Sequence, residues 1–265
     1  MPALISIIVP CFNHGEFLAE AVGSVTRLNR DDLELIVVDD GSTDARTRDE
    51  MDKLCLRGIK VIRQTNQGLA GARNAGVRNS TGKYLLPLDA DNRLRAAYLE
   101  KGALILDAHP EIGVVYGDAE YIGTRSGRSV VGSFDPGKLL NWNFIDACAL
   151  YRRPVWEQNQ GYDGTMPVQG LEDWDFWLGA LGQGWQFAYL PEVAFDYRMA
   201  GESMLTRVKG AEDKIAEFVA RKHGPLYREA WLRLRRERSS VKATLRNLVR
   251  LCRERVPGPN PRRRP

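Results

Sequence analysis

Tyr84-Leu85-Leu86-Pro87-Leu88-Asp89-Ala90-Asp91 joins an apolar, strand-like run to two carboxylates. Because side chains alternate along an extended chain, Asp89 and Asp91 point to the same side of the sheet edge. Carboxylate oxygens suit Mg²⁺ and Mn²⁺, usually together with phosphate oxygens. Acidic residues occupy 34 of the 265 positions, so an ordinary acidic loop after a strand would produce the same triplet.

The segments before this stretch alternate between strand and helix patterns. Leu4–Val9 is an apolar, β-branched run and predicts a strand buried on both faces. Apolar residues at helical spacing predict a helix over Glu16–Thr26. The same patterns predict strands over Leu33–Val38, Ile59–Gln64 and Tyr84–Leu88, and helices over Ala45–Leu56 and Leu69–Asn79. This alternation indicates an α/β fold with a doubly wound, mostly parallel sheet, in which ligands bind beyond the carboxyl ends of the strands.

After a predicted helix over Ala96–Asp107, the chain changes to shorter segments. The strands predicted there are Ile112–Tyr116, Ala119–Thr124, Ser129–Phe134, Ala147–Tyr151, Phe187–Leu190 and Val193–Tyr197, and the helix is Leu171–Leu181. No linker rich in Pro and Gly separates these segments from the first part. We therefore expect one domain over residues 1–209, with a doubly wound half at 1–110 and a smaller mixed half at 111–209.

A basic C-terminal extension follows this domain. Residues 210–256 are predicted to be helical, with a break at Gly224-Pro225, and residues 257–265 to be a disordered tail. Arg228–Pro265 contains 13 Lys or Arg and 3 Asp or Glu, which is +10; the whole chain carries +4, leaving −6 on residues 1–227. Val241–Cys252 has the pattern of an amphipathic basic helix, which could pack on the body, contact an anionic membrane or bind a protein partner. The acidic body argues against a general nucleic-acid binder.

The composition is that of a globular protein, with 43% hydrophobic and 27% charged residues. No run of 18 apolar residues predicts a membrane span, and Met1-Pro2-Ala3-Leu4 lacks the basic start of a signal peptide. The four cysteines are scattered, which favours reduced thiols over a metal site or disulfides. We expect a cytoplasmic protein, peripheral at the inner face of the membrane if its basic helix binds there.

Four blocks, in this order, resemble the family 2 glycosyltransferases, which have the GT-A fold. The blocks are Ser6–Asn13, Val37–Asp44, Asn66–Gly76 and Leu88–Asn92, within a resemblance over roughly residues 4–205. The resemblance implies an inverting enzyme that uses a nucleotide-diphospho-sugar and Mn²⁺ or Mg²⁺. It makes 1–110 the nucleotide-binding half and 111–209 the acceptor half. The residues alone indicate only a metal and diphosphate site on an α/β sheet.

The resemblance implies that the nucleotide base binds at the ends of the first two strands. Pro10, Phe12 and Asn13 would contact the base, although Phe12 could instead belong to the core. Asp40 matches the family carboxylate that accepts the uracil N–H. Such an acceptor favours uracil or thymine over cytosine, which lacks this donor. Asp44 could serve only as a helix N-cap.

The third and fourth blocks would hold the donor's phosphates, sugar and metal. Gly68 opens a helix whose free N–H groups and positive dipole end suit a phosphate or a sugar hydroxyl, and Arg73 would add charge. The small residues around them could equally serve only close packing of helix on sheet. Asp91 matches the family's metal ligand, and Asp89 matches its partner, which faces the sugar or ribose.

Leu171–Trp177 resembles the E-D-W block on the family's acceptor side. An inverting transfer needs a carboxylate that takes the proton of the acceptor hydroxyl, so Asp173 is the predicted base and Glu172 its alternative. Both could instead be acids that interact with a helix dipole. Aromatic side chains nearby could form a sugar platform or belong to the core; these are Trp142, Trp174, Trp177 and Trp185.

The chain departs from the family pattern at Ala200, where a histidine is often found, so Arg198 or Ser203 would have to replace it. It has neither a Gln-x-x-Arg-Trp sequence nor predicted spans, which favours transfer of one sugar to a glycan or lipid-linked acceptor. Cell-envelope or polysaccharide synthesis is the expected setting for such a transfer. One alternative is a non-catalytic carbohydrate- or membrane-binding module derived from a transferase. Another is a sugar-nucleotide pyrophosphorylase, although the loop after the first strand lacks the Gly-rich, basic sequence that such chemistry needs.

Overall fold

The computed structural model describes residues 4–199, 210–230, 232 and 236. The predicted basic helix at 241–252, the predicted disordered tail at 257–265, and the positions Ala200 and Ser203 lie outside the described residues. The chain divides into two compact units, Met1–Val219 and Ala220–Pro265, and all the site residues discussed below belong to the first. The domain boundaries given above stay predictions.

The first half of the sheet is parallel, with the strand order β3-β2-β1-β4. Its strands are β1 (Ile5–Cys11), β2 (Leu33–Asp39), β3 (Lys60–Arg63) and β4 (Tyr84–Pro87), and its helices are α1 (Gly15–Thr26), α2 (Ala45–Leu56) and α3 (Gly68–Arg78). All seven elements occur where the sequence predicts them, with small differences at their ends. The predicted doubly wound arrangement is therefore confirmed for this half.

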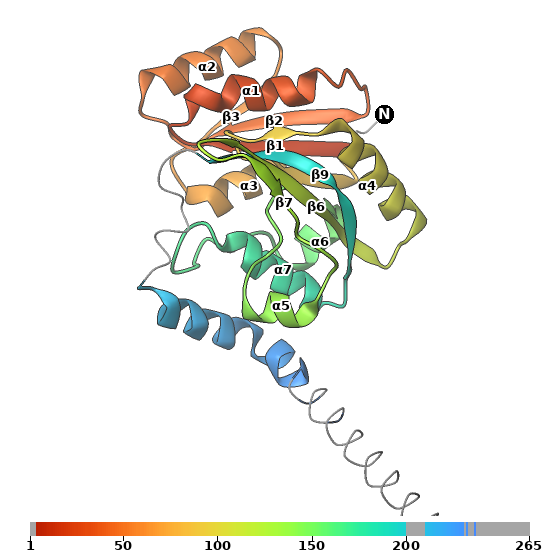
Figure 1. Cartoon of the computed structure of the whole chain (residues 1–265). Coiled ribbons are helices and arrows are strands. Elements are labelled where there is room, and N and C mark those ends of the chain that lie inside the picture. The colour runs from red at the N-terminus through yellow and green to blue at the C-terminus, as the bar shows by residue number, and fades with distance from the viewer. Residues whose placement is uncertain (1–3, 200–209, 231, 233–235, 237–265) are drawn as a thin grey trace, which may run out of the picture. The chain divides into compact units, whose positions relative to one another are not determined.

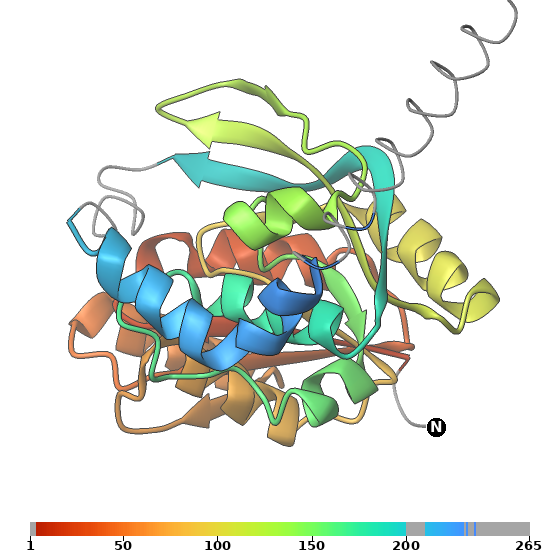
Figure 2. The same ribbon diagram turned by 90° about the horizontal axis from the view of Figure 1, so that it is seen from below.

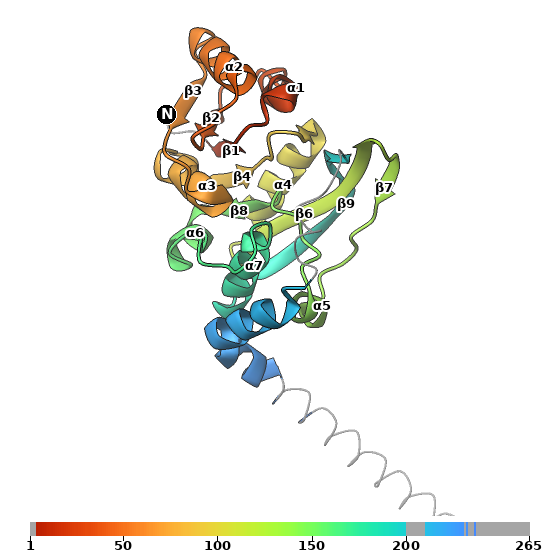
Figure 3. The ribbon, with the colours of Figure 1, turned by 90° about the vertical axis from the view of Figure 1, so that its left-hand side faces the viewer.

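Helices cover both faces of the parallel strands. Figure 1 shows α1 and α2 above the strands and α3 below them, and in Figure 3 α4 (Ala96–Ala108) lies on the same side as α1. Ile5, Ile7 and Val9 share a buried core with residues of α1 and α4. Ile8 faces α3, because a Cβ on Gly76 would come within 2.3 Å of Ile8 Cγ2. Burial on both faces explains the mostly apolar sequence of β1.

The second half of the sheet is mixed, as predicted. Beyond β4 the order continues β8-β6-β9-β5. β8 (Leu150–Arg152) is antiparallel to β4 and β6 (Ile112–Gly123), whereas β9 (Gln186–Met199) is parallel to β6. β5 (Arg93–Leu94) pairs with β9 and β7 (Gly127–Ser129) with β6, and Figure 2 shows the β6–β7 hairpin alongside β9. The other helices are α5 (Pro136–Asn141), α6 (Arg153–Gln158) and α7 (Glu172–Gly182).

Some predicted boundaries in this half are wrong. The four segments predicted in the ranges 112–124 and 187–197 are two long strands, β6 and β9, which keep pairing across register shifts beside Gly117 and Pro191. The predicted strand Ser129–Phe134 is a strand only up to Ser129. Past that point the N–H of Val131 donates to Asp118 Oδ1 (2.9 Å) and not to a neighbouring strand.

A further helix covers residues 212–230. The break predicted at Gly224-Pro225 is wrong, because a proline removes one backbone donor and bends a helix without necessarily ending it. Within the described ranges, no helix combines the length and the apolar character that a membrane crossing requires.

Replacing Gly76 with Ala tests how closely α3 packs on β1. The added methyl would lie 2.3 Å from Ile8 Cγ2, and Ile8 is fully buried, so helix or strand must shift. We expect Gly76→Ala to lower the free energy of unfolding by about 1–3 kcal/mol, despite the better helix propensity of Ala. Urea unfolding followed by circular dichroism measures this loss. Gly164→Ala is the control, since its Cβ would approach only Ala70 Cβ, at 4.0 Å, and an unchanged midpoint for Gly76→Ala would contradict the close packing.

Candidate active site

The loops that follow β1 and β2 are joined by Asn13. Its backbone has a left-handed φ of 55°, and its N–H donates to Ser42 Oγ (3.1 Å). Its side-chain Oδ1 accepts from the N–H groups of Thr43 (2.8 Å) and Asp44 (3.2 Å). Asp44 in turn caps α2 by accepting from Thr47 N (2.8 Å), as predicted. Asn13 therefore shapes the rim where the nucleotide is expected. Its side-chain oxygen is already used in hydrogen bonds to the loop after β2.

Asp40 is buried at this rim with one carboxylate oxygen fixed. Its Oδ1 accepts from Gln64 Nε2 (2.7 Å) and from the N–H of Gln67 (2.9 Å). No described residue is recorded as a donor to its second oxygen. One half of the carboxylate is therefore held by the loop before α3, and the other half is available to an N–H donor of a ligand.

The other predicted nucleotide contacts differ in exposure. Pro10 is buried within β1, whereas the Phe12 side chain is 44% exposed, so Phe12 is not a core residue. Gly68 begins α3 with φ +74°, and a Cβ there would come within 2.9 Å of Gln169 Nε2. A glycine at position 68 is required by both its backbone conformation and this approach.

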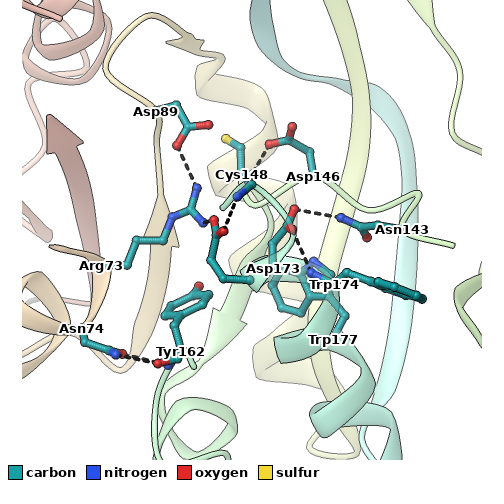
Figure 4. A network of polar contacts seen from close by, with 12 residues as sticks. Arg73, Asn74, Asp89, Asn143, Asp146, Cys148, Tyr162, Asp173, Trp174 and Trp177 are labelled. Carbon is teal, nitrogen blue, oxygen red and sulfur yellow. Dashed lines mark hydrogen bonds and ion pairs between the residues drawn. The ribbon is translucent and has the colours of Figure 1, made fainter. Parts of the chain in front are cut away.

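Arg73 lies at the centre of the site, only 2% exposed. Its Nη2 donates to Asp89 Oδ1 (2.9 Å), as Figure 4 shows, and its Nη1 forms an ion pair with Glu172. The guanidinium carbon lies 5.6 Å from the centre of the Tyr162 ring. Burial opposes the charge, but Asp89 and Glu172 outweigh it and raise the pKa of Arg73 above its usual range. A donor phosphate would thus meet an arginine that is already paired on both terminal nitrogens.

Glu172 and Asp173 open α7 in different environments. Both oxygens of Glu172 are occupied, one by Arg73 and the other by the N–H of Gly170 (2.8 Å). Asp173 has no direct cationic partner among the described residues. Its Oδ1 accepts from Trp174 N (2.8 Å) and its Oδ2 from Asn143 Nδ2 (2.9 Å), contacts drawn in Figure 4.

Asp173 has the environment of a general base. Burial, and then the charge of Glu172, raise the pKa of Asp173 well above its usual range. A carboxylate with a raised pKa takes up a proton near neutral pH more readily than an exposed one. Glu172, with both oxygens used by internal contacts, is less suited to proton transfer. The geometry thus favours Asp173 over its alternative.

Asp89 and Asp91 offer oxygens for a metal. Burial, and then the charge of Asp89, raise the pKa of Asp91, so a bound cation would relieve an unfavourable negative charge. In the described part of the chain, no group of three or more His, Cys, Asp or Glu side chains could enclose a metal by itself. The two carboxylates therefore fit a divalent ion only if other oxygens, such as those of a diphosphate, complete the shell.

Arg198, in β9, contacts the turn that contains Asp91 and Asn92. Its Nε donates to the backbone oxygen of Asp91 (3.0 Å), and its N–H donates to Asn92 Oδ1 (3.0 Å). Its Nη2 pairs with Glu20 Oε2 (2.6 Å), and the guanidinium lies over the ring of Phe17. Arg198 thus fixes the backbone beside the predicted metal ligand Asp91. Whether it replaces the family's histidine stays a prediction.

Comparison with known proteins identifies the family. The model of glycosyl transferase family 2 matches residues 6–158, more than half of the chain. This chain belongs to the family 2 glycosyltransferases. The matched range contains the first four sequence blocks and ends before Asp173.

An uncharacterized glycosyltransferase of Nostoc sp. is 36% identical over 188 residues, which are 65% of this chain and 56% of that protein. A PGL/p-HBAD biosynthesis glycosyltransferase of Mycobacterium bovis is 35% identical over 178 residues, 65% of this chain and 68% of the relative. The chain thus spans little more than half of the Nostoc protein.

Solved structures agree on the fold of this family 2 chain. S. aureus TarS 1–349 in complex with UDP-GlcNAc has a TM-score of 0.63 at 20% identity, over 78% of this chain and 61% of that one. The mannosyltransferase PcManGT from Pyrobaculum calidifontis, in complex with GDP-Man and Mn²⁺, has a TM-score of 0.61 at 20% identity, over 80% and 61%. At this identity the likeness shows the fold alone. The predicted family and GT-A fold are confirmed.

Asp146 belongs to this family 2 site but was not among the predicted residues. Its Oδ1 accepts from the N–H of Cys148 (2.8 Å), and Figure 4 shows Asp146 above Asp173 and across from Asp89. Burial, and then the charge of Asp89, raise the pKa of Asp146 to about 7. The sequence contains a signal for it, because Asp146 is the only charged residue of the otherwise apolar run Phe144–Leu150.

The aromatic residues near the site divide into core and surface. Trp174 and Trp177 are buried, and their Nε1 atoms donate to Leu139 O (2.7 Å) and Ile145 O (3.1 Å). These two residues therefore belong to the core. Trp142 is 42% exposed and its ring centre lies 5.5 Å from that of Trp174. For Trp142, the role in a sugar platform stays a prediction.

Replacing Arg73 with Met tests its part in stability. The change removes the cation and leaves Glu172 buried without its partner, a situation that costs about 3–5 kcal/mol of unfolding free energy. We expect urea unfolding to show a loss of this size for Arg73→Met. The control is Arg78→Met on the exposed side of α3, which should change stability by less than about 0.5 kcal/mol. Equal stabilities of the two variants would show that the ion pairs with Asp89 and Glu172 are unimportant.

Proposed function

We propose that this family 2 glycosyltransferase is an inverting, metal-dependent enzyme that transfers one sugar from a UDP- or dTDP-sugar to an acceptor hydroxyl. The observation that carries this proposal is the chain of contacts from Asp89 through Arg73 to Glu172, beside Asp173. It links the carboxylates expected at the donor diphosphate to the carboxylate expected at the acceptor. A donor and an acceptor must meet between such groups for a direct transfer.

Asp173 would act as the general base. As the acceptor oxygen attacks the anomeric carbon, its proton passes to the carboxylate of Asp173, and the bond from that carbon to the diphosphate oxygen breaks. The diphosphate leaves with the electron pair, and attack from the opposite face inverts the configuration. The transition state resembles an oxocarbenium ion. The raised pKa of Asp173 supports this role, because it increases the affinity of the carboxylate for a proton.

Asp91 and Asp89 would hold a divalent metal, Mn²⁺ or Mg²⁺. When bound, such an ion neutralises the charge that develops on the leaving diphosphate. The presence of Mn²⁺ in the PcManGT complex supports this choice. Asp89 would also keep its contact with Arg73, so that the metal site and the centre of the active site share one carboxylate.

The base would be recognised beside Phe12 and Asp40. The free half of the Asp40 carboxylate suits the N–H of uracil or thymine, and the exposed ring of Phe12 can contact the base. The UDP-GlcNAc complex of TarS supports a UDP-sugar, although the GDP-Man complex of PcManGT shows that this fold also accepts another base. The acceptor would be a glycan or a lipid-linked molecule. The exposed ring of Trp142 would contact it where it enters the active site. Contact of the basic C-terminal segment with an anionic membrane stays a prediction.

Thermal unfolding with nucleotides tests the donor site. We expect UDP or dTDP with Mn²⁺ to raise the melting temperature more than CDP does. A ligand at a hundred times its Kd adds about 2.7 kcal/mol, equivalent to roughly 5–10 °C for a domain of this size. Asp91→Ala should lose the part of the shift that depends on Mn²⁺, whereas Asp49→Ala, on the exposed side of α2, should keep it. No shift with any nucleotide would favour the non-catalytic binding module.

Replacing Asp173 with Asn tests the base. The variant should bind the donor as the wild type does, yet transfer sugar about 10²–10⁴ times more slowly. Release of nucleoside diphosphate from a panel of nucleotide-sugars with glycan acceptors measures the transfer. Asn offers only one acceptor oxygen where Asp173 accepts from both Trp174 and Asn143, so some loss of stability is expected. A melting-temperature shift with UDP and Mn²⁺ as large as that of the wild type shows that the variant is folded and excludes unfolding as the cause. Turnover equal to that of the wild type would refute the assignment.

A further inference from the structure

Asn143 contacts the proposed base from the segment between α5 and β8. Its Nδ2 donates to Asp173 Oδ2 (2.9 Å), and its Oδ1 accepts from the N–H of Ile145 (3.3 Å). The second contact decides how the amide is turned, because the N–H of Ile145 can bond only to the oxygen. The NH₂ group of Asn143 is therefore held toward the carboxylate by its own loop.

Asp173 needs a donor of this kind because the groups around it oppose its ionisation. Glu172 on α7 and Asp146 before β8 carry like charges, and Tyr162 adds a phenol to the same buried environment. Arg73 on α3 is the cation that favours the charged form, but its terminal nitrogens bond to Asp89 and Glu172.

The second hydrogen bond to Asp173 comes from its own helix, through the N–H of Trp174. Among the described residues, Asn143 is the one side chain recorded as a donor to Asp173. Each carboxylate oxygen has two lone pairs, so Oδ2 can accept from Asn143 and still receive the proton of an acceptor hydroxyl. The contact with Asn143 thus leaves the base able to react.

We propose that Asn143 is a positioning residue for the transfer, which fixes the rotation of the Asp173 carboxylate and favours its ionised form. The inference rests on the proposed role of Asp173 as the base. Asn143 touches neither donor nor acceptor in this arrangement, and acts through Asp173. Removing its NH₂ group should leave the carboxylate free to rotate and easier to protonate.

Asn143→Asp separates this role from a purely structural one. The new side chain has the same size and can still accept from the N–H of Ile145, but it no longer donates to Asp173 and adds a like charge. Asn141→Asp is the matched control, since it makes the same change two residues away, on the exposed part of α5, where the Asn141 amide donates to the backbone oxygen of Gly137 (2.8 Å). Asn143→Ser, which removes the amide without adding charge, replaces Asn143→Asp if the latter does not fold.

The first readout is the melting temperature of the full chain between pH 5 and pH 8, which needs no substrate. A carboxyl whose pKa is raised by folding stabilises the fold while it is protonated, and this stability is lost as the pH rises through the raised pKa. Loss of the Asn143 donor should raise that pKa further. We therefore expect the deficit of Asn143→Asp relative to wild type to be larger at pH 8 than at pH 5. In an Asp173→Asn background this extra deficit should disappear, and Asn141→Asp should show none in either background.

The second readout is the pH profile of nucleoside diphosphate release from UDP-GlcNAc. The acid limb of the kcat profile should move up by about one pH unit in Asn143→Asp, with a fall in kcat of roughly tenfold or more and an unchanged KM for the donor. Melting curves parallel to those of the wild type, or a deficit that persists in the Asp173→Asn background, would overturn the inference. If Asp173→Asn itself transfers sugar normally, Asp173 is not the base. The positioning role proposed for Asn143 is then refuted as well. If Asp173→Asn is inactive and Asn143→Asp behaves as wild type, only the inference about Asn143 fails.

Discussion

The buried guanidinium of Arg73 is the constraint on which the arrangement of the site depends. A buried cation is tolerated when opposite charges compensate it. Here both terminal nitrogens are paired, by residues from distant parts of the chain, whereas Nε is buried without a hydrogen-bond partner in the described structure. Asp89 follows β4, and Glu172 begins α7, 99 residues after Arg73. The pairing therefore fixes α3, the end of β4 and the start of α7 relative to one another. These elements carry the expected donor, metal and acceptor groups.

The same pairing separates the roles of two adjacent carboxylates. Glu172 pairs with Arg73 and has its second oxygen bonded to the backbone, which makes it less suited to the proposed proton transfer. Asp173, the next residue, is buried without a direct cationic partner and has a raised pKa. Two acids with the same sequence context thus acquire different chemistry from their environments, the usual way in which a protein assigns a structural and a catalytic role.

The sequence was sufficient for the parts of the fold that depend on local patterns. The apolar run of β1 and the helical spacing in α1 predicted the parallel half, and the polar residues after β1, β2 and β4 predicted one rim. Local patterns failed in the second half. β6 and β9 tolerate irregular register because they pair with each other over most of their length. The short helices α5 and α6, which both have a proline in the first turn, lack enough residues to show a periodicity.

The contacts of the site were predictable only in part, because they join residues that are remote in sequence. Family blocks indicated Asp40, Asp91 and Asp173, but nothing near Arg73 indicated that Glu172 would be its partner. Asn143 lies 30 residues before the carboxylate it contacts, and an asparagine in a loop carries no pattern of its own. The sequence thus predicted residue types at the rim, whereas their pairing required the three-dimensional structure.

The direction of β8 explains why the segment before it reaches the active site. β8 is antiparallel to β4, with Leu85 opposite Tyr151, so the residues that precede β8 arrive at the carboxyl end of β4, next to Asp89. The hydroxyl of Tyr98 holds the start of β8 beside β6, because it accepts from Leu150 N (2.8 Å) and donates to Val115 O (2.7 Å). A parallel strand at this position would have placed the same loop at the opposite edge of the sheet. The antiparallel insertion therefore brings the segment that contains Asn143 and Asp146 to the rim where the parallel strands end.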